Sequence, residues 1–300
     1  MTFHVPIMCK EILEYLAPQS GDIILDGTLG GGGHTQALLA SCPDITRVVG
    51  MDRDEEAITH LKALLPTDKL TTIRGNFSDF SQLLKDHRIV GVNKVILDLG
   101  ISSHQIDVAQ RGFSYQHEGP LDMRMDTSSS LDMTAEKILQ DYSEKALTRV
   151  FKEYGEEPAS AAIAREIVQR RQSHPLQTTL QLAELIRWFI RGGYSRKMMA
   201  VKRIFQAIRI EVNGELVTLR KSLLDLAGSL PSQGRMVVLT FHSLEDRIVK
   251  QTFQELSLAE PSVEEQSIVK LTKKAIRPSR EEIRVNKRST SAKLRAIFRR

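Results

Sequence analysis

The sequence predicts an α/β fold, in which an all-helical domain is inserted into a domain built on a parallel sheet. Three observations lead to this prediction. At residues 22–40 a short apolar run passes through four consecutive glycines straight into a helical pattern, which indicates a strand, a tight turn and a helix. Strand and helix patterns then alternate up to residue 100, at a spacing typical of a parallel sheet. Residues 133–210 show helical periodicity alone, and a strand pattern returns at residues 235–241.

We therefore expect two domains. The sheet domain consists of residues 1–107 and 211–300, and the second of these segments ends in a basic tail. The inserted helical domain consists of residues 108–210. A length of 300 residues suits one large domain or two ordinary ones, and a hydrophobic fraction of 41% is enough for a substantial core.

The first predicted elements lead to a glycine-rich turn. Residues 6–16 indicate a short helix with Pro6 at its first position, and residues 22–34 (DIILDGTLGGGGH) follow after a turn. In an open α/β sheet such a strand–turn–helix junction lies at the carboxyl end of the strand, where ligands bind. Glycine permits positive φ angles and lets a ligand approach the backbone closely. The alternative is a merely flexible loop, but four glycines between a buried strand and a helix favour a nucleotide-like ligand.

This turn does not match the common phosphate-binding patterns. The dinucleotide fingerprint G-x-G-x-x-G/A needs glycine or alanine where this chain has Thr35 or Gln36. The P-loop pattern G-x-x-x-x-G-K-[ST] is absent as well. S-adenosylmethionine contains an adenosine and an amino acid but no phosphate, so a glycine loop that need not hold a pyrophosphate suits it.

A second predicted strand, at residues 47–54, ends in acids. An acid at the end of the second strand of a Rossmann-like sheet binds ribose hydroxyls, and a carboxylate does this well because it accepts several hydrogen bonds. Asp52 has this position. It could instead cap the helix that follows, but Asp54 could also fill that role.

The third predicted strand, at residues 70–77, ends in Asn76 and Phe77. An aromatic side chain at that point can cover the face of an adenine, although Phe77 could equally belong to the core.

The fourth predicted strand, at residues 95–100, has Asp98 near its end. Asp26, Asp52 and Asp98 therefore all close predicted strands. Carboxylates gathered at one edge of a sheet suit a cationic ligand, and the sulfonium of S-adenosylmethionine is one.

The middle of the chain is predicted to be helical after a long connection. Residues 102–130 have no sustained period of two or 3.6, and long segments of this kind are often functional. We expect the single tryptophan, Trp188, to belong to the helical core rather than to bind a nucleobase. Helices are predicted to begin at Ser143, at Pro158, at Thr178 or Thr179, and near Lys197.

The sheet resumes with the strand at residues 235–241. Ser243 and Asp246 then resemble a capping box before a further helix, with aspartate in place of glutamate. Residues 294–298 are predicted to form a last strand in the basic tail.

The composition limits the possible classes of protein. No apolar run approaches the length of a membrane span, and the N-terminus does not resemble a secretory signal. Cys9 and Cys42 form no metal-binding pattern and little disulfide framework. We therefore expect a cytoplasmic protein that has no membrane association and no metal site.

Positive charge is concentrated in two segments. Residues 270–300 contain twelve Lys and Arg and two Glu, a local charge of +10 in a chain whose net charge is +5. Residues 187–209 contain seven Lys and Arg and no acid. Clustered positive charge favours a polyanionic partner such as nucleic acid. A solvated charged surface is the plainer interpretation, and aromatic residues for stacking are few.

Several segments together resemble one known family, the bacterial small-subunit (16S) ribosomal RNA cytosine-N4-methyltransferases, RsmH or MraW. The resemblance extends in order over nearly the whole chain. The segments that carry it are DGTLGGGGHT, GMDRD, LDLGISS, RGFSYQHEGPLDMRMD, RIFQAIRIEVNGEL, TFHSLEDRIVK and NKRSTSAKLR.

This resemblance implies a class I (Rossmann-like) methyltransferase domain with a helical domain inserted after the fourth strand. It implies S-adenosyl-L-methionine as cofactor and ribosomal RNA, within the small ribosomal subunit, as partner. The oligomeric state, monomer or homodimer, stays open. The cofactor contacts that it implies fall on Gly32, Gly33, His34, Asp52, Phe77, Asp98 and Gln105.

The sequence departs from the family pattern at three positions. His104 occupies the place of the usual proline in the S-S-P-Q run, beside Gln105. Lys287 and Thr290 replace proline and arginine in the usual N-P-R-S-R-S-A. The first departure bears on the geometry around Gln105, and the other two bear on RNA contacts of the tail.

The implied reaction is direct methyl transfer to the exocyclic amine of a cytidine. The chain lacks the Pro-Cys nucleophile of cytosine-C5 methyltransferases and the Asp/Asn-Pro-Pro-aromatic loop of DNA amino-methyltransferases. Because Asp98 and the segment around His242 and Ser243 follow sheet strands, we expect them to face the target base, with Asp98 and His242 as catalytic residues. For His242 a structural hydrogen bond at a strand end is the alternative.

The rival functions are a methyltransferase that acts on DNA, protein or a small molecule, and a non-catalytic S-adenosylmethionine- or RNA-binding factor.

Overall fold

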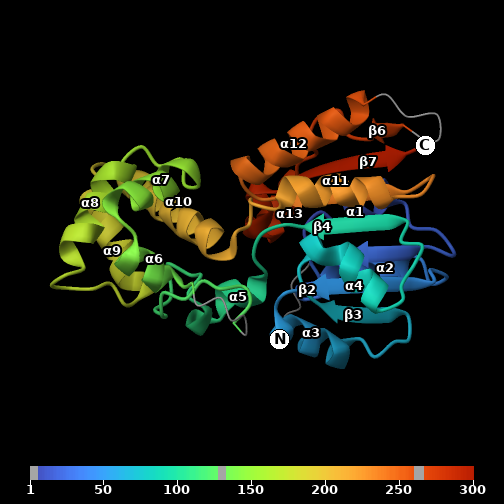
Figure 1. The fold of residues 1–300 in the computed structure, drawn as a ribbon, viewed down its shortest axis with the longest axis horizontal. Helices are drawn as coiled ribbons and strands as arrows, with labels where there is room; N and C mark the ends of the chain where they lie inside the picture. Colours follow the sequence, from blue (N-terminus) through green and yellow to red (C-terminus); the bar gives the residue numbers. More distant parts are fainter. Residues whose placement is uncertain (1–5, 128–132, 260–266) are drawn as a thin grey trace. The chain divides into compact units, whose positions relative to one another are not determined.

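The computed structural model of the chain describes residues 6–127, 133–259 and 267–300. It contains two compact units, which are described separately below (Figure 1). Unit 1 comprises Met1–Gly100 and Leu216–Arg300, and unit 2 comprises Ile101–Glu215. The sequence analysis placed the corresponding boundaries at residues 107/108 and 210/211.

Unit 1 is built on a seven-stranded sheet with the order β3-β2-β1-β4-β5-β7-β6 among the described residues. The first five strands along the chain run parallel to one another, whereas β7 is antiparallel to both β5 and β6. The α/β fold class is therefore confirmed. The strands are β1 (Ile23–Asp26), β2 (Arg47–Asp52), β3 (Leu70–Arg74), β4 (Lys94–Asp98), β5 (Arg235–Thr240), β6 (Ile268–Lys270) and β7 (Lys293–Arg299).

Helices cover both faces of this sheet, because alternate strand residues point to opposite sides. Leu25 and Val95 belong to the apolar cluster that includes residues of α11 and α12, whereas Ile24 and Ile96 belong to the cluster that includes residues of α1 and α2. The helical elements of unit 1 are α1 (Cys9–Leu16), α2 (Gly33–Ser41), α3 (Glu55–Leu64), η1 (Phe77–Asp79), α4 (Phe80–Asp86), α11 (Leu219–Ser229), α12 (Ser243–Leu258), α13 (Arg280–Val285) and η3 (Lys287–Ser291).

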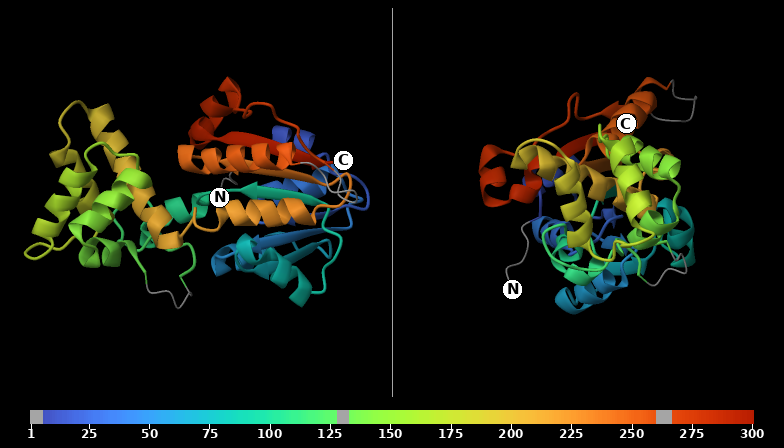
Figure 2. Two further views of the ribbon diagram at one scale, coloured as in Figure 1. Left: turned by 45° about the horizontal axis from the view of Figure 1, so that its top comes forward. Right: turned by 90° about the vertical axis from the view of Figure 1, so that its left-hand side faces the viewer.

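Unit 2 is helical (Figure 2), as the periodicity predicts, and has its own apolar core. The helix starts predicted at Ser143 and at Thr178 or Thr179 are confirmed. Ser143 and Thr178 are the N-caps, since their hydroxyls accept hydrogen bonds from the backbone N–H groups of Ala146 and Gln181. The elements of unit 2 are α5 (Ser103–Asp107), η2 (Ala109–Arg111), α6 (Ala135–Asp141), α7 (Glu144–Glu153), α8 (Ser160–Arg170), α9 (Thr179–Phe189) and α10 (Tyr194–Asn213).

Several sequence predictions about local structure are wrong. The first helix begins at Cys9 rather than Pro6. The connection after residue 102 contains α5 and η2, although its residues 128–130 lie outside the described part of the chain. Trp188 is 79% exposed rather than part of the core. At about 100° per residue, Trp188 falls on the side of α9 opposite Leu182 and Ile186, which are fully buried.

Candidate functional site

The glycine loop between β1 and α2 has a shape that requires glycine. Gly30 and Gly32 have positive φ angles of 49° and 74°. A Cβ atom at Gly32 would lie 2.2 Å from Leu61 Cδ1 of α3, whereas a Cβ atom at Gly31 would meet nothing within 4 Å. The loop is thus packed closely against α3 at one glycine and open at the next. This open, side-chain-free backbone is what a ligand needs for close approach.

Asp26, at the end of β1, holds this loop in place through two hydrogen bonds. Its Oδ2 accepts a hydrogen bond of 2.7 Å from the Thr35 hydroxyl, and its Oδ1 accepts one of 3.3 Å from the Thr28 N–H. Burial raises the pKa of Asp26 to about 6, although these bonds and nearby His34 oppose the rise. Both carboxylate oxygens are engaged by the loop itself, so Asp26 positions the loop rather than presenting a free group to a ligand.

Asp52 at the end of β2 lies against the other side of the loop. Its Oδ2 accepts a 2.7 Å bond from the Gly30 N–H, and its Oδ1 accepts a 2.9 Å bond from the Asp54 N–H. Burial raises the pKa of Asp52 despite these bonds. The N-cap of α3 is Asp54, whose carboxylate accepts from the Glu56 N–H at 3.1 Å. Since a carboxylate offers about four lone-pair sites, Asp52 retains acceptor capacity for hydroxyl groups.

Phe77 lies beside the same strand ends, just beyond β3. It begins η1, whose N-cap Asn76 accepts a 3.1 Å hydrogen bond from the Ser78 N–H. A Cβ atom at Gly27 would lie 3.1 Å from Phe77 Cβ, so the two residues are close neighbours. Phe77 packs against the sheet core but is only partly buried. One part of the Phe77 side chain therefore belongs to the core, and the rest is accessible, as a cover for an adenine face must be.

His34 and Asp98 bring together the ends of α2 and β4. The His34 Nε2 and Asp98 Oδ2 atoms lie 3.3 Å apart, and the Asp98 N–H donates to the Thr28 hydroxyl. Burial lowers the pKa of His34, but the Asp98 and Cys9 side chains, together with the charges of Asp98 and Asp26, outweigh this effect and raise the pKa to about 10. His34 is thus an imidazolium at neutral pH, and its positive charge lies beside the Asp98 carboxyl group.

One carboxylate oxygen of Asp98 makes no hydrogen bond within the described part of the chain. Asp98 Oδ1 is buried and has no hydrogen-bond partner among the described residues. A buried carboxylate oxygen without a partner is unfavourable, and such groups mark places where a ligand supplies the missing donor. A cationic donor or an amine meets this need.

The unusual pKa of His34 makes stability depend on pH. Between pH 6.5, the ordinary histidine pKa, and pH 10 the folded chain holds one proton more than the unfolded chain. The free energy of unfolding should therefore fall with rising pH, by up to about 1.4 kcal/mol per pH unit from this group. We expect urea unfolding at pH 7 to 9.5 to show this slope in the wild type relative to His34→Gln. Parallel pH curves for the two proteins would contradict the ion pair.

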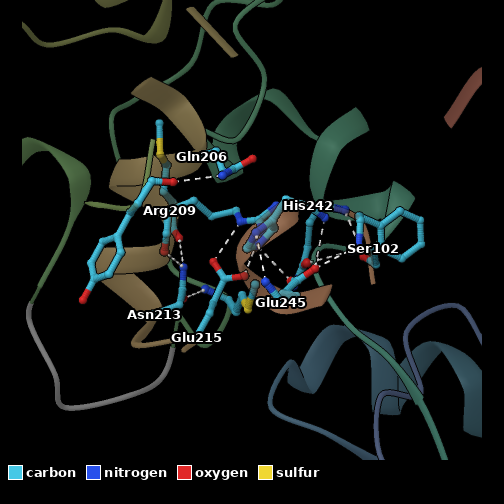
Figure 3. Close-up of polar contacts among 12 residues, drawn as sticks. Ser102, Gln206, Arg209, Asn213, Glu215, His242 and Glu245 are labelled. Carbon is cyan, nitrogen blue, oxygen red and sulfur yellow. Dashed lines mark hydrogen bonds and ion pairs between the residues drawn. The ribbon is translucent and has the colours of Figure 1, made fainter. Parts of the chain in front are cut away.

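His242, the second candidate catalytic residue, follows β5, the neighbour of β4. It is the N-cap of α12, and its Nδ1 accepts from the Glu245 N–H at 3.5 Å. Its Nε2 lies 3.0 Å from Glu245 Oε1, and Glu245 Oε2 accepts from the Phe241 N–H at 2.9 Å. Figure 3 shows the His242 and Glu245 side chains together at this strand end.

The capping box predicted for Ser243 and Asp246 is therefore wrong, because it lies one residue earlier, at His242 and Glu245. Asp246 instead binds Lys293 Nζ at 2.8 Å and Arg295 Nε at 2.7 Å, on β7. Burial raises the pKa of Asp246, but these two cations together hold it below its ordinary value. Two charges of the basic tail are consequently used inside unit 1.

Gln105 belongs to unit 2, unlike the other candidate cofactor residues. It is buried in the first turn of α5, where it forms a capping box with Ser102. The Gln105 Oε1 atom accepts from the Ser102 N–H at 3.0 Å, and the Ser102 hydroxyl accepts from the Gln105 N–H at 3.2 Å.

A polar network in unit 2 involves residues that the sequence analysis did not single out. Arg209 of α10 binds Glu215 through two hydrogen bonds of 2.8 Å. Asn213 accepts from the Met125 N–H and donates to the Met123 carbonyl, each at 2.8 Å (Figure 3). These bonds fix the segment around Met123 to the end of α10, which explains the polar residues of the RIFQAIRIEVNGEL segment.

No helix within the described ranges is long and apolar enough to cross a membrane.

Comparison with known proteins identifies the family. The model of the MraW methylase family matches residues 1–300. A protein of Syntrophotalea carbinolica named ribosomal RNA small subunit methyltransferase H is 43% identical, covering 99% of this chain and 98% of that protein. A protein of the same name from Carboxydothermus hydrogenoformans is 42% identical, covering 98% and 96%. The crystal structure of an rRNA methylase from Streptococcus thermophilus aligns with 10% identity and a TM-score of 0.42, covering 97% of this chain and 93% of that one.

The whole-length family match agrees with the sheet order, the glycine loop and the strand-end acids of unit 1. The chain therefore belongs to the MraW methylase family and is an S-adenosylmethionine-dependent methyltransferase.

Proposed function

We propose that this protein transfers the methyl group of S-adenosylmethionine to the exocyclic N4 of a cytidine in small-subunit (16S) ribosomal RNA, in the cytoplasm. The full-length relatives are named for small-subunit ribosomal RNA methylation. The observation that carries the proposal is the buried Oδ1 of Asp98, which lacks a partner among the described residues and lies beside the His34 imidazolium. It offers a hydrogen-bond acceptor at the ligand-binding edge of the sheet.

The residues present fit the methyl donor. The glycine loop, which is open at Gly31 and carries no side chains at Gly32 and Gly33, would admit it closely, the Asp52 carboxylate would accept hydrogen bonds from ribose hydroxyls, and the exposed part of Phe77 would cover the adenine. Gln105 is assigned to the binding of S-adenosylmethionine by its match to the family motif. When bound, the donor supplies a methyl group on a positively charged sulfur.

Asp98 would orient and activate the acceptor. The lone pair of the cytidine N4 is delocalised into the ring, so this nitrogen is a poor nucleophile. A carboxylate that accepts a hydrogen bond from the amine draws electron density toward nitrogen and fixes its direction, and it would take up the proton that N4 loses on methylation. His34 would hold that carboxyl group in place through the ion pair without contacting the base. A cytidine extruded from its neighbours is required, because the deep major groove of an RNA helix hides base edges.

His242 is proposed to face the same base, from the end of the neighbouring strand. Its capping role makes His242→Ala ambiguous, whereas asparagine is also a good N-cap. We therefore expect His242→Asn to keep the thermal stability of the wild type and to lose roughly tenfold or more in turnover. If His242→Asn kept wild-type turnover, His242 would serve only as the N-cap of α12.

A methyl-transfer assay tests the proposed function. Small ribosomal subunits from cells that lack this protein would be incubated with the purified chain and S-adenosylmethionine labelled in the methyl group. We expect label in N4-methylcytidine of the RNA and none in duplex DNA of the same cells. Label that goes only to DNA, to protein or to no substrate would overturn the proposal.

A further inference from the structure

Unit 2 contains a pocket that takes no part in the site described above. Its volume is about 790 Å³, and it is formed by the end of α9, the first turns of α10 and the segment before α8. Arginine and aromatic side chains line much of it, among them Phe189, Arg191, Tyr194, Arg196 and Arg203.

Large apolar side chains are exposed around this pocket. Tyr194 is 77% exposed and Met199 is 48% exposed, and both line the pocket. Trp188 is 79% exposed and directly precedes the lining residue Phe189. Exposed aromatic residues that gather at one place on a surface usually mark a binding site. Tryptophan and tyrosine are also the side chains on which unpaired nucleobases stack.

Cations without partners accompany these aromatics. Arg191, Arg196 and Lys202 are exposed, and none of them pairs with a carboxylate within the described ranges. Other cations of the basic stretch at residues 187–209 are already paired with carboxylates, since Arg203 lies 3.5 Å from Glu157 and Arg209 binds Glu215. The carboxylate that lines the pocket, Glu157, is itself 5% exposed. Glu184 is exposed one turn before Trp188, but the exposed charges that line the pocket itself, Arg191 and Arg196, are positive.

We propose that this α9–α10 surface binds a single-stranded segment of the RNA substrate. It is defined by the pocket-lining residues Arg191, Tyr194 and Arg196, together with Trp188 and Lys202, which adjoin the lining residues Phe189 and Met199 on their helices. The aromatic rings stack on bases and the three cations neutralise phosphates. This inference rests on the proposed function, and it adds a docking surface on the helical unit to the site at the strand ends. Positive charge combined with exposed rings favours RNA over a protein partner, which would bury aromatics without needing unpaired cations.

The single tryptophan of the chain reports directly on this surface. We expect an oligouridine of about eight nucleotides to quench the fluorescence of Trp188 in the full-length protein, because a base stacks on its ring. The triple variant R191A/R196A/K202A should bind at least about tenfold more weakly at low salt, with a smaller salt dependence. The matched control K145A/K152A, on the exposed side of α7, should bind like the wild type. Absence of quenching, or equal loss in the control, would overturn the proposal.

Steady-state methylation of small ribosomal subunits tests whether the surface serves the reaction. In W188A/Y194A we expect KM for subunits to rise about tenfold or more, at roughly 1–3 kcal/mol per stacked base, with kcat and S-adenosylmethionine affinity near wild-type values. An unchanged KM would overturn the docking role. Quenching by whole subunits but not by naked RNA would replace RNA with a ribosomal protein as partner. Failure of the proposed function is distinguishable, since the wild type would then methylate no RNA although oligouridine still quenched Trp188.

Discussion

Replacing Asp98 with asparagine should lower the turnover of methyl transfer by roughly a hundredfold or more, while the affinity for S-adenosylmethionine falls much less. Asparagine has nearly the same shape but carries no charge. It would leave the buried His34 without its ion-pair partner, 3.3 Å away in the wild type, and would give the cytidine amine a weaker acceptor. Single-turnover methylation of small subunits and calorimetric titration with the cofactor measure the two effects separately.

The matched control is Asp54→Asn. Asp54 is also an aspartate at a strand end, but its carboxylate caps α3, and asparagine caps helices about equally well. Its turnover should stay within about twofold of the wild type, as expected for a substitution that touches no reacting group. If Asp98→Asn behaved like Asp54→Asn, the carboxylate would have no part in the chemistry, and the partnerless Oδ1 atom would need another explanation.

The second large effect is expected at Gly32. Alanine at this position must adopt a φ angle near +74° and places its Cβ 2.2 Å from Leu61 Cδ1. Because Leu61 is fully buried, α3 or the loop must shift. We expect Gly32→Ala to lower the free energy of unfolding by about 1–3 kcal/mol and to weaken S-adenosylmethionine binding at least about tenfold, since a displaced loop no longer fits the ligand.

Gly31→Ala is the control within the same loop. Nothing lies within 4 Å of its Cβ, and its φ angle is not positive. Its stability should stay within about 0.5 kcal/mol of the wild type, as for other substitutions away from packed features. Urea unfolding and calorimetry apply to both variants. Equal losses of stability at the two positions would show that the loop depends on flexibility as such rather than on the geometry at Gly32.

The strand ends were predictable because they depend on local patterns. Apolar runs that end in aspartate locate β1, β2 and β4, and parallel pairing brings their carboxyl ends to one edge of the sheet. What the pattern could not reveal is how the three acids divide their roles. Only the contacts show that Asp26 is occupied by Thr28 and Thr35, whereas Asp98 keeps an oxygen without a partner.

The errors have physical reasons as well. Ser243 resembles an N-cap more than histidine does, so the sequence alone could not show that His242 and Glu245 cap α12. Trp188 was predicted to be buried because it is large and apolar, although the helical period places it opposite the buried side of α9. Neither β6 nor the pairing of Asp246 with β7 has a strong local signal, because both depend on residues distant in sequence.

Nucleoside mass spectrometry of small-subunit ribosomal RNA tests the central claim most directly. RNA from cells that lack this protein would be compared with RNA from the same cells supplied with the wild-type chain or with Asp98→Asn. We predict that N4-methylcytidine is absent without the protein, returns with the wild type and does not return with the variant. An unchanged amount of N4-methylcytidine in cells without the protein would contradict the account.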